Sequence, residues 1–169
     1  MSLNVTVTNP EDSPVKVAIR PGGSGYVAEV TMILDTSQYA SGDVLTLPKQ
    51  VVVNGKPCGS VTIVSIVVSD EDDQGAAIKV SFAKDATPLG VVNSAPSISD
   101  TGASAGIMGV ISIAATDYED LGGVQVATKT NVPLQVKLDG NGNFWVSLRN
   151  GTGTPTYTVN GLKLKIGYV

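Results

Sequence analysis

The densest group of titratable side chains in the sequence is the run Asp70-Glu71-Asp72-Asp73. Loop carboxylates are the usual ligands of Ca²⁺, which takes about six to eight oxygens. Asp70, Asp72 and Asp73 are therefore candidate ligands of a calcium or magnesium ion. The run has no distant glutamate to complete a calcium-binding loop. We favour a second interpretation, a solvated turn whose charges aid solubility and deter pairing between sheet edges.

Catalytic side chains of the common kinds are scarce. The sequence contains no histidine, the residue that most often acts as a general base or binds a metal near neutral pH. Its one cysteine, Cys58, excludes a disulfide within the chain and a zinc site of several cysteines. Catalysis by a serine and a lysine would need a desolvated lysine, and most lysines fall at outward strand positions or in turns. We therefore expect no catalytic centre, no cofactor and no enzymatic activity.

The elements that would position any site are β-strands. Charged residues make up only 15% of the chain, and 19 glycines and nine prolines indicate many turns. Residues 26–34 alternate, with Val30, Met32 and Leu34 inward. Residues 60–69 are apolar on both faces, which predicts a central strand. Further strands are expected at 50–54, 76–83, 109–116, 123–128, 133–138, 143–149, 155–159 and 162–168.

Two turns between these strands predict hairpins. The polar stretch Asp70–Gly75 separates residues 60–69 from 76–83, and Asp139–Gly142 separates residues 133–138 from 143–149. Across the second hairpin, one apolar set should face another in the core. These sets are Leu134, Val136 and Leu138, and Phe144, Val146 and Leu148. Short strands at this spacing predict an all-β fold, a β-sandwich of jelly-roll-like form. The long irregular segments 35–48 and 86–107 have room for a helical turn.

The first 25 residues are expected to form an extended N-terminal arm with a glycine-rich hinge, followed by a sandwich body at residues 26–169. Two short alternating runs in the arm are interrupted by prolines and are too short for a stable isolated hairpin. Their apolar side chains are candidate contacts to another subunit. These residues are Val5, Val7, Val15, Val17 and Ile19.

Charge and hydropathy exclude other partners. The formal net charge is −4 with a pI near 4.6, which argues against a nucleic-acid partner because such proteins present a basic face. No apolar run reaches the roughly 18 residues of a membrane span, and the N-terminus lacks the pattern of a signal peptide. We therefore expect no membrane partner and synthesis in a cytoplasm.

Several segments of the body carry distinctive turn and strand patterns. They are LDTSQYASGDVL (34–45), SIVVSDEDDQG (65–75), NSAPSISDTGAS (93–104), ATDYEDLGG (115–123), ATKTNVPL (127–134) and NGTGTPTYTVNGLKLKIGY (150–168). The arm adds the runs Val-Thr-Val-Thr-Asn and Pro-Val-x-Val, each present in one copy. These segments resemble a family of small structural proteins from tailed bacteriophages and prophages, whose arm repeats the same two runs. The resemblance spans nearly the whole chain, through turn and strand patterns rather than catalytic signatures.

The resemblance implies a virion structural protein made in the bacterial host cytoplasm, and the favoured role is a capsid decoration (cement) protein on the capsid surface. Its expected partners are the major capsid protein and further copies of itself. A homotrimer is favoured, and a dimer remains open. The alternatives are a carbohydrate- or receptor-binding module and a minor head or tail component. Phe144-Trp145 is the aromatic pair that could stack on a sugar, although core or interface packing is the favoured role.

Overall fold

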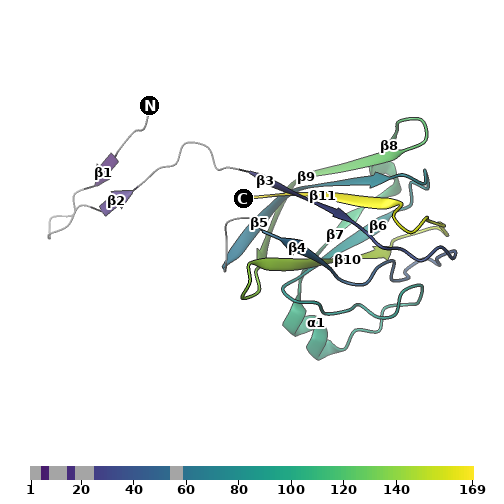
Figure 1. The fold of residues 1–169 in the computed structure, drawn as a ribbon, viewed down its shortest axis with the longest axis horizontal. Helices are drawn as coiled ribbons and strands as arrows, with labels where there is room; N and C mark the ends of the chain where they lie inside the picture. The colour runs from purple at the N-terminus through teal and green to yellow at the C-terminus, as the bar shows by residue number, and fades with distance from the viewer. Residues whose placement is uncertain (1–4, 8–14, 18–24, 54–58) are drawn as a thin grey trace.

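The computed structural model describes residues 5–7, 15–17, 25–53 and 59–169, and its body is a sandwich of two antiparallel sheets (Figure 1). The four-stranded sheet has the order β4-β10-β6-β7, and the five-stranded sheet has the order β3-β11-β5-β9-β8. The body strands are β3 (Tyr26–Thr31), β4 (Lys49–Val52), β5 (Ser60–Asp70), β6 (Ile78–Ala83), β7 (Ile107–Ile113), β8 (Tyr118–Asp120), β9 (Gln125–Lys137), β10 (Asn143–Asn150) and β11 (Leu162–Tyr168).

The strand pairing is that of a jelly roll. The outermost strands of the body pair with each other, β3 with β11, and the pairs β4 with β10, β5 with β9 and β6 with β7 nest inside. This nesting is a long antiparallel hairpin rolled into two sheets. The short β8 adds to the free edge of β9. The predicted all-β, jelly-roll-like sandwich is therefore confirmed.

Both predicted hairpins are wrong as local pairings. The Asp70–Gly75 turn carries the chain from β5 in one sheet to β6 in the other, and Asp139–Gly142 does the same between β9 and β10. The two predicted apolar sets belong to different sheets and pack into the one core between them, rather than pairing along a ladder. A tight local hairpin joins β8 to β9 instead, where Gly122 and Gly123 have φ of 83° and 112°. Glycine suits this turn because it adopts positive φ without a steric cost.

The core lies between the two sheets and follows the predicted alternation. Val30, Met32 and Leu34 are at most 5% exposed, and Phe144, Val146 and Leu148 are fully buried. Strand β5 lies between β11 and β9, so the expected central strand is confirmed. Val136 and Leu138 are buried and Leu134 is half-buried.

Two predictions of separate strands are wrong, and several other predicted strands start or end up to three residues from the observed bounds. Residues 123–128 and 133–138 belong to one strand, β9, which continues through a bulge opposite Ile63 and Ser65, with Asn131 at a φ of 55°. Residues 155–159 form no strand. Instead they contact the chain after β3 through two backbone bonds, from Leu34 N to Val159 O and from Tyr39 N to Pro155 O, both close to 3 Å. Such isolated bonds do not make a ladder.

The segment between β6 and β7 contains the helix α1 (Asp100–Gly106), in agreement with the helical turn that the sequence allowed in residues 86–107. Ser99 caps α1, because its side chain accepts a hydrogen bond from Gly102 N. This segment lies beside the four-stranded sheet (Figure 1). The 3₁₀-helix η1 (Ala115–Asp117) follows β7. Within the described residues no helix is long and apolar enough to cross a membrane.

Strands β1 (Val5–Val7) and β2 (Val15–Val17) form a separate two-stranded sheet. They pair antiparallel, with Val5 opposite Val17 and Val7 opposite Val15. The expectation that these runs lie outside the main sheet agrees with this pairing. The expectation that the two runs are too short for a stable isolated hairpin concerns their stability and stays a prediction. Ile19 and the glycine-rich hinge lie outside the described residues.

Candidate functional site

The acidic turn begins with a buried carboxylate. Asp70, at the end of β5, is 0% exposed and accepts backbone hydrogen bonds from Asp72 N (3.1 Å), Gln74 N (3.1 Å) and Gly75 N (2.9 Å). Burial raises the pKa of Asp70, and the three main-chain donors oppose that shift. The interpretation of the run as a solvated turn is therefore wrong for Asp70, because this side chain organises the turn from inside.

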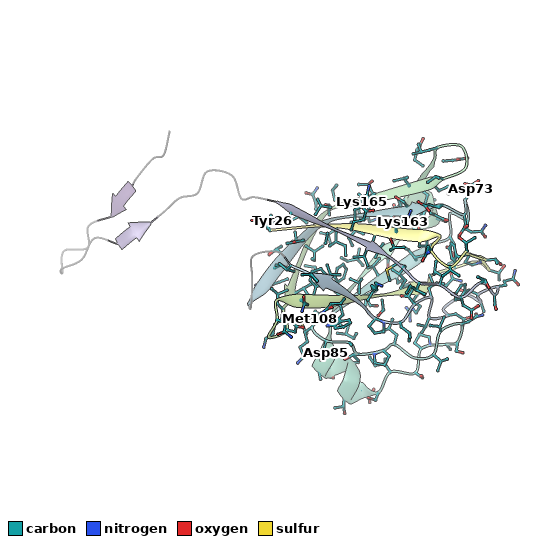
Figure 2. The ribbon with its side chains drawn as sticks, viewed as in Figure 1. Tyr26, Asp73, Asp85, Met108, Lys163 and Lys165 are labelled. Carbon is teal, nitrogen blue, oxygen red and sulfur yellow. The ribbon has the colours of Figure 1, made fainter. Side chains whose placement is uncertain are left out.

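The other three acidic side chains of the run bind other parts of the body. The Asp72 carboxylate accepts bonds from Thr158 N (2.7 Å) and Thr158 Oγ1 (3.0 Å), which link the turn to the segment before β11. Asp73 Oδ1 accepts a bond from Gln125 Nε2 (2.9 Å) at the start of β9. Glu71 forms an ion pair with Lys163 of β11. Figure 2 shows Asp73 and Lys163 on the same side of the body.

These contacts define what the candidate metal ligands do. The carboxylates of Asp70, Asp72 and Asp73 accept from different protein donors and hold three segments together. Within the residues that the structure describes, no three acidic, histidine or cysteine side chains gather in an arrangement that could hold a metal ion. The turn is therefore best described as a connection between the ends of β5, β9 and β11.

The buried Tyr157 and the half-buried Tyr118 lie close enough to this connection to feel the charge of Asp70. Burial raises the pKa of Tyr157 and of Tyr118, and the negative charge of Asp70 adds to both shifts. On the other side of Tyr157, Tyr39 lies with its ring centroid 6.2 Å away and its hydroxyl accepts a bond from Asp35 N (2.7 Å). Burial raises the pKa of Tyr39 to about 12. The Tyr39 hydroxyl also donates to Leu45 O (3.2 Å), so Tyr39 both packs and makes hydrogen bonds. Among the described residues the buried hydroxyls of Tyr118 and Tyr157 have no hydrogen-bond partner, so these two side chains contribute by packing.

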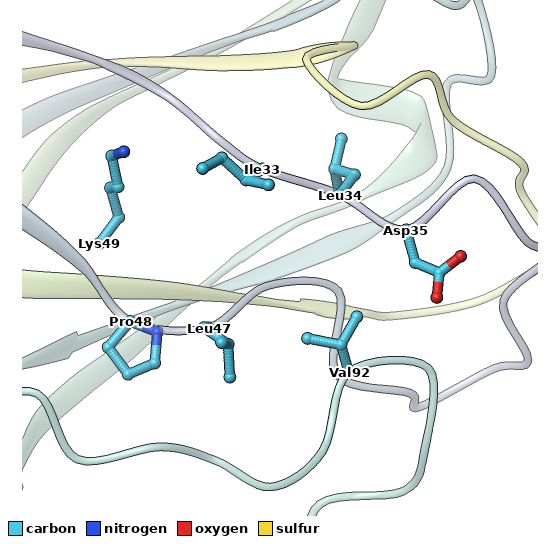
Figure 3. A pocket seen from close by; sticks show the side chains of 7 residues that line it. All are labelled: Ile33, Leu34, Asp35, Leu47, Pro48, Lys49 and Val92. Carbon is cyan, nitrogen blue, oxygen red and sulfur yellow. The ribbon is translucent and has the colours of Figure 1, made fainter.

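An apolar groove opens at one side of the sandwich (Figure 3). It lies where the chain leaves β3, at Ile33–Asp35, and where it enters β4, at Leu47–Lys49, with a volume of about 330 Å³. Ile33 is 59% exposed and Leu47 is 60% exposed. Since β3 and β4 are the last strands of their sheets, the groove lies between two sheet edges.

One residue in the sequence indicated this groove, although the alternating pattern of residues 26–34 did not identify it. Ile33 falls at an outward position of the run 26–34, between the inward Met32 and Leu34. A large apolar side chain at an outward position has no folding role within its own sheet. Leu47 lies in the irregular segment 35–48, where no face could be assigned from periodicity. In Figure 3, the charged side chains of Lys49 and Asp35 lie at opposite ends of the groove.

The remaining candidate residues are placed as follows. The backbones of β1 and β2 pair antiparallel, and this ladder contains Val5, Val7, Val15 and Val17. Phe144 is buried in the core beside Phe82, with ring centroids 6.0 Å apart, so it cannot stack on a sugar. Trp145 is half-buried on the outer face of β10. Cys58 lies outside the described residues.

Neither the models of known protein families nor the curated protein sequences contain a match to this chain.

Proposed function

We propose that this chain is a non-enzymatic virion structural protein, a decoration protein that binds the outside of a tailed-phage capsid and stabilises the head. The sequence resemblance to small phage structural proteins suggests this role. The observation that carries the proposal is the exposed apolar groove between the free edges of β3 and β4, lined by Ile33 and Leu47. Exposed apolar surface next to unpaired strand edges favours association with another protein.

The jelly-roll body suits a module that reinforces a shell. Its strands β3 to β11 make a continuous core between two sheets, with Met32, Ile66, Val146 and Leu164 fully buried. Such close-packed interiors have low compressibility and transmit strain. A rigid body that bridges neighbouring capsid subunits would therefore resist their separation. Repeated attachment over a symmetric shell would multiply weak contacts.

The arm would supply a second contact in this proposal. Its Val-x-Val runs offer apolar side chains and a main chain that can add to a neighbour's sheet edge. Ordering a segment costs about 1–2 kcal/mol per residue, so a productive arm contact must be broad. We propose the major capsid protein and sister copies as the partners. A homotrimer is the favoured assembly, and a dimer is the alternative.

The proposal is tested with particles of the phage or prophage that encodes the chain, prepared without this protein. Purified protein is added, the particles are sedimented, and occupancy is measured by gel densitometry. The wild-type chain should bind to saturation and raise the temperature at which heads release their DNA. Failure of the wild-type chain to bind, or a location on tails only, would contradict the decoration role.

Matched variants locate the contact. Leu47→Glu places a charge in the groove and should reduce occupancy. Leu121→Glu makes the same change at a side chain that is 66% exposed in the β8–β9 turn, and it should bind like wild type. A variant that begins at Gly22 should fold and occupy heads poorly. Equal occupancy by all of these would show that neither groove nor arm makes the contact. Selective signals on a glycan array would instead favour the carbohydrate-binding alternative.

A further inference from the structure

A second cleft lies between the outer face of the four-stranded sheet and the segment that contains α1. It has a volume of about 390 Å³, within the range of about 300–1,000 Å³ that is typical of small-molecule sites. Its walls are mostly apolar side chains from both layers. They include Leu89, Pro96, Ile98, Ile107, Met108 and Val110. Figure 2 shows Met108 close to α1.

Two polar side chains of the sheet face this apolar cleft. On β6 the buried Val80 and Phe82 point into the core, so Ser81 between them points outward into the cleft, where it is 5% exposed. On β10 the buried Leu148 points inward, so Arg149 points outward to the same face, where it is half-buried. A serine hydroxyl and a guanidinium therefore line one wall.

Among the residues that the structure describes, Arg149 forms no ion pair with a carboxylate. The ion pairs among the described residues join Lys129 to Asp117 and Lys163 to Glu71. The residue directly opposite Arg149 on β6 is Lys79, a second cation. Like charges at directly opposite positions of an antiparallel pair destabilise the sheet. An anion bound at Arg149 would relieve this repulsion, so the site is electrostatically prepared for one.

We propose that this cleft binds an aliphatic carboxylate, such as a medium-chain fatty acid. The head group lies at Arg149, beside Ser81, and the alkyl chain lies along Leu89, Ile107 and Met108. The planar fork of a guanidinium donates two parallel bonds to the two oxygens of one carboxylate. A phosphate would leave further charged oxygens against apolar walls, which is unfavourable. Such binding is separate from the proposed capsid contact, since the cleft and the groove have no lining residue in common.

The experiment uses the full chain labelled with ¹³C at its methionine methyl groups and titrated with sodium octanoate. The chain has three methionines, and they report separately. Met108 lines the cleft, whereas Met32 is fully buried between the sheets. Octanoate should shift the Met108 signal to saturation and leave Met32 in place. A shift of both signals together, or no saturable shift, would overturn the proposal.

Charge and chain length are varied separately. Arg149→Gln should weaken octanoate binding by about tenfold or more, as expected for loss of a charge-assisted bond. Lys165→Gln removes a charge from the exposed side of β11 and should leave binding unchanged. With the wild-type chain, 1-octanol and acetate should each bind more weakly than octanoate. Equal affinity for octanol, or for octanoate in Arg149→Gln, would overturn the carboxylate assignment. If Arg149→Gln does not fold, the comparison of octanol with octanoate on the wild-type chain still tests the carboxylate assignment.

Discussion

Replacing Asp70 by alanine tests whether this buried carboxylate organises the turn between the sheets. Asp70→Ala removes the acceptor of three backbone hydrogen bonds at once, from Asp72, Gln74 and Gly75. Asp70→Asn keeps one oxygen of similar geometry. Two of the three bonds are made to Oδ2, so an asparagine whose oxygen takes this position retains two bonds and loses the third.

The expected magnitude follows from the exposure of the three donors. A buried donor left without an acceptor costs about 1–3 kcal/mol. Gln74 is exposed, so water replaces its bond, whereas Asp72 and Gly75 are half-buried. Relief of the buried charge offsets part of the loss. We expect Asp70→Ala to lower the free energy of unfolding by about 2–4 kcal/mol and Asp70→Asn by about 1–2 kcal/mol.

The assay is urea unfolding followed by tryptophan fluorescence. Trp145 is the single tryptophan and lies half-buried on β10, so its emission reports loss of the sandwich. Glu119→Gln removes a charge from an exposed position and serves as the control. If Asp70→Ala stays within about 0.5 kcal/mol of wild type, as ordinary surface substitutions do, the structural role assigned to Asp70 is wrong.

The pH dependence gives an independent check. The folded-state pKa of Asp70 is raised above its ordinary value of 3.8, so the folded protein binds the proton more tightly than the unfolded chain. This group therefore adds stability as pH falls through the raised pKa, and its contribution is complete below 3.8. The stability advantage of wild type over Asp70→Asn should grow on acidification through this window. An advantage that shrinks there would show that burial does not dominate the environment of Asp70.

Three further outcomes are expected. Val146→Ala should lower the free energy of unfolding by about 1–3 kcal/mol through a cavity, and Val146→Asp should prevent folding; an unchanged melting temperature for Val146→Asp would refute the strand register. The backbone N–H of Asn143 lowers the pKa of Asp139, so the stabilising contribution of the Asp139 carboxylate is present above pH 3.8 and is lost as pH falls. The melting temperature of Asp139→Asn should therefore depend less on pH than that of wild type between pH 6 and about 3. Millimolar calcium should leave the melting temperature unchanged, because Asp72 is bonded to Thr158; a calcium-induced rise that Asp72→Ala abolishes would establish a metal site at the turn.

The candidate surfaces were predictable only in part. The acidic run was evident from composition, but the burial of Asp70 was not. The turn crosses between the sheets and encloses Asp70, whereas a hairpin turn would have exposed it. The groove depends on Ile33 and Leu47, which lie 14 positions apart in the sequence and meet only because β3 and β4 end their respective sheets. The cleft at Arg149 depends on the long segment with α1 lying against β6 and β10, which no local pattern encodes.

The amino-acid sequence by itself determined where most strands run and which faces are buried. Alternation placed Val30, Met32 and Leu34 inward, and the two-sided apolar run at 60–69 became the central strand β5. Only the tertiary structure decided which strands pair. The turns at 70–75 and 139–142 have hairpin-like compositions, yet each crosses from one sheet to the other. The physical reason is that both sheets bury their inner faces in one core. The alternation of apolar and polar residues is therefore the same whether the next strand pairs with its predecessor in one sheet or lies in the opposite sheet.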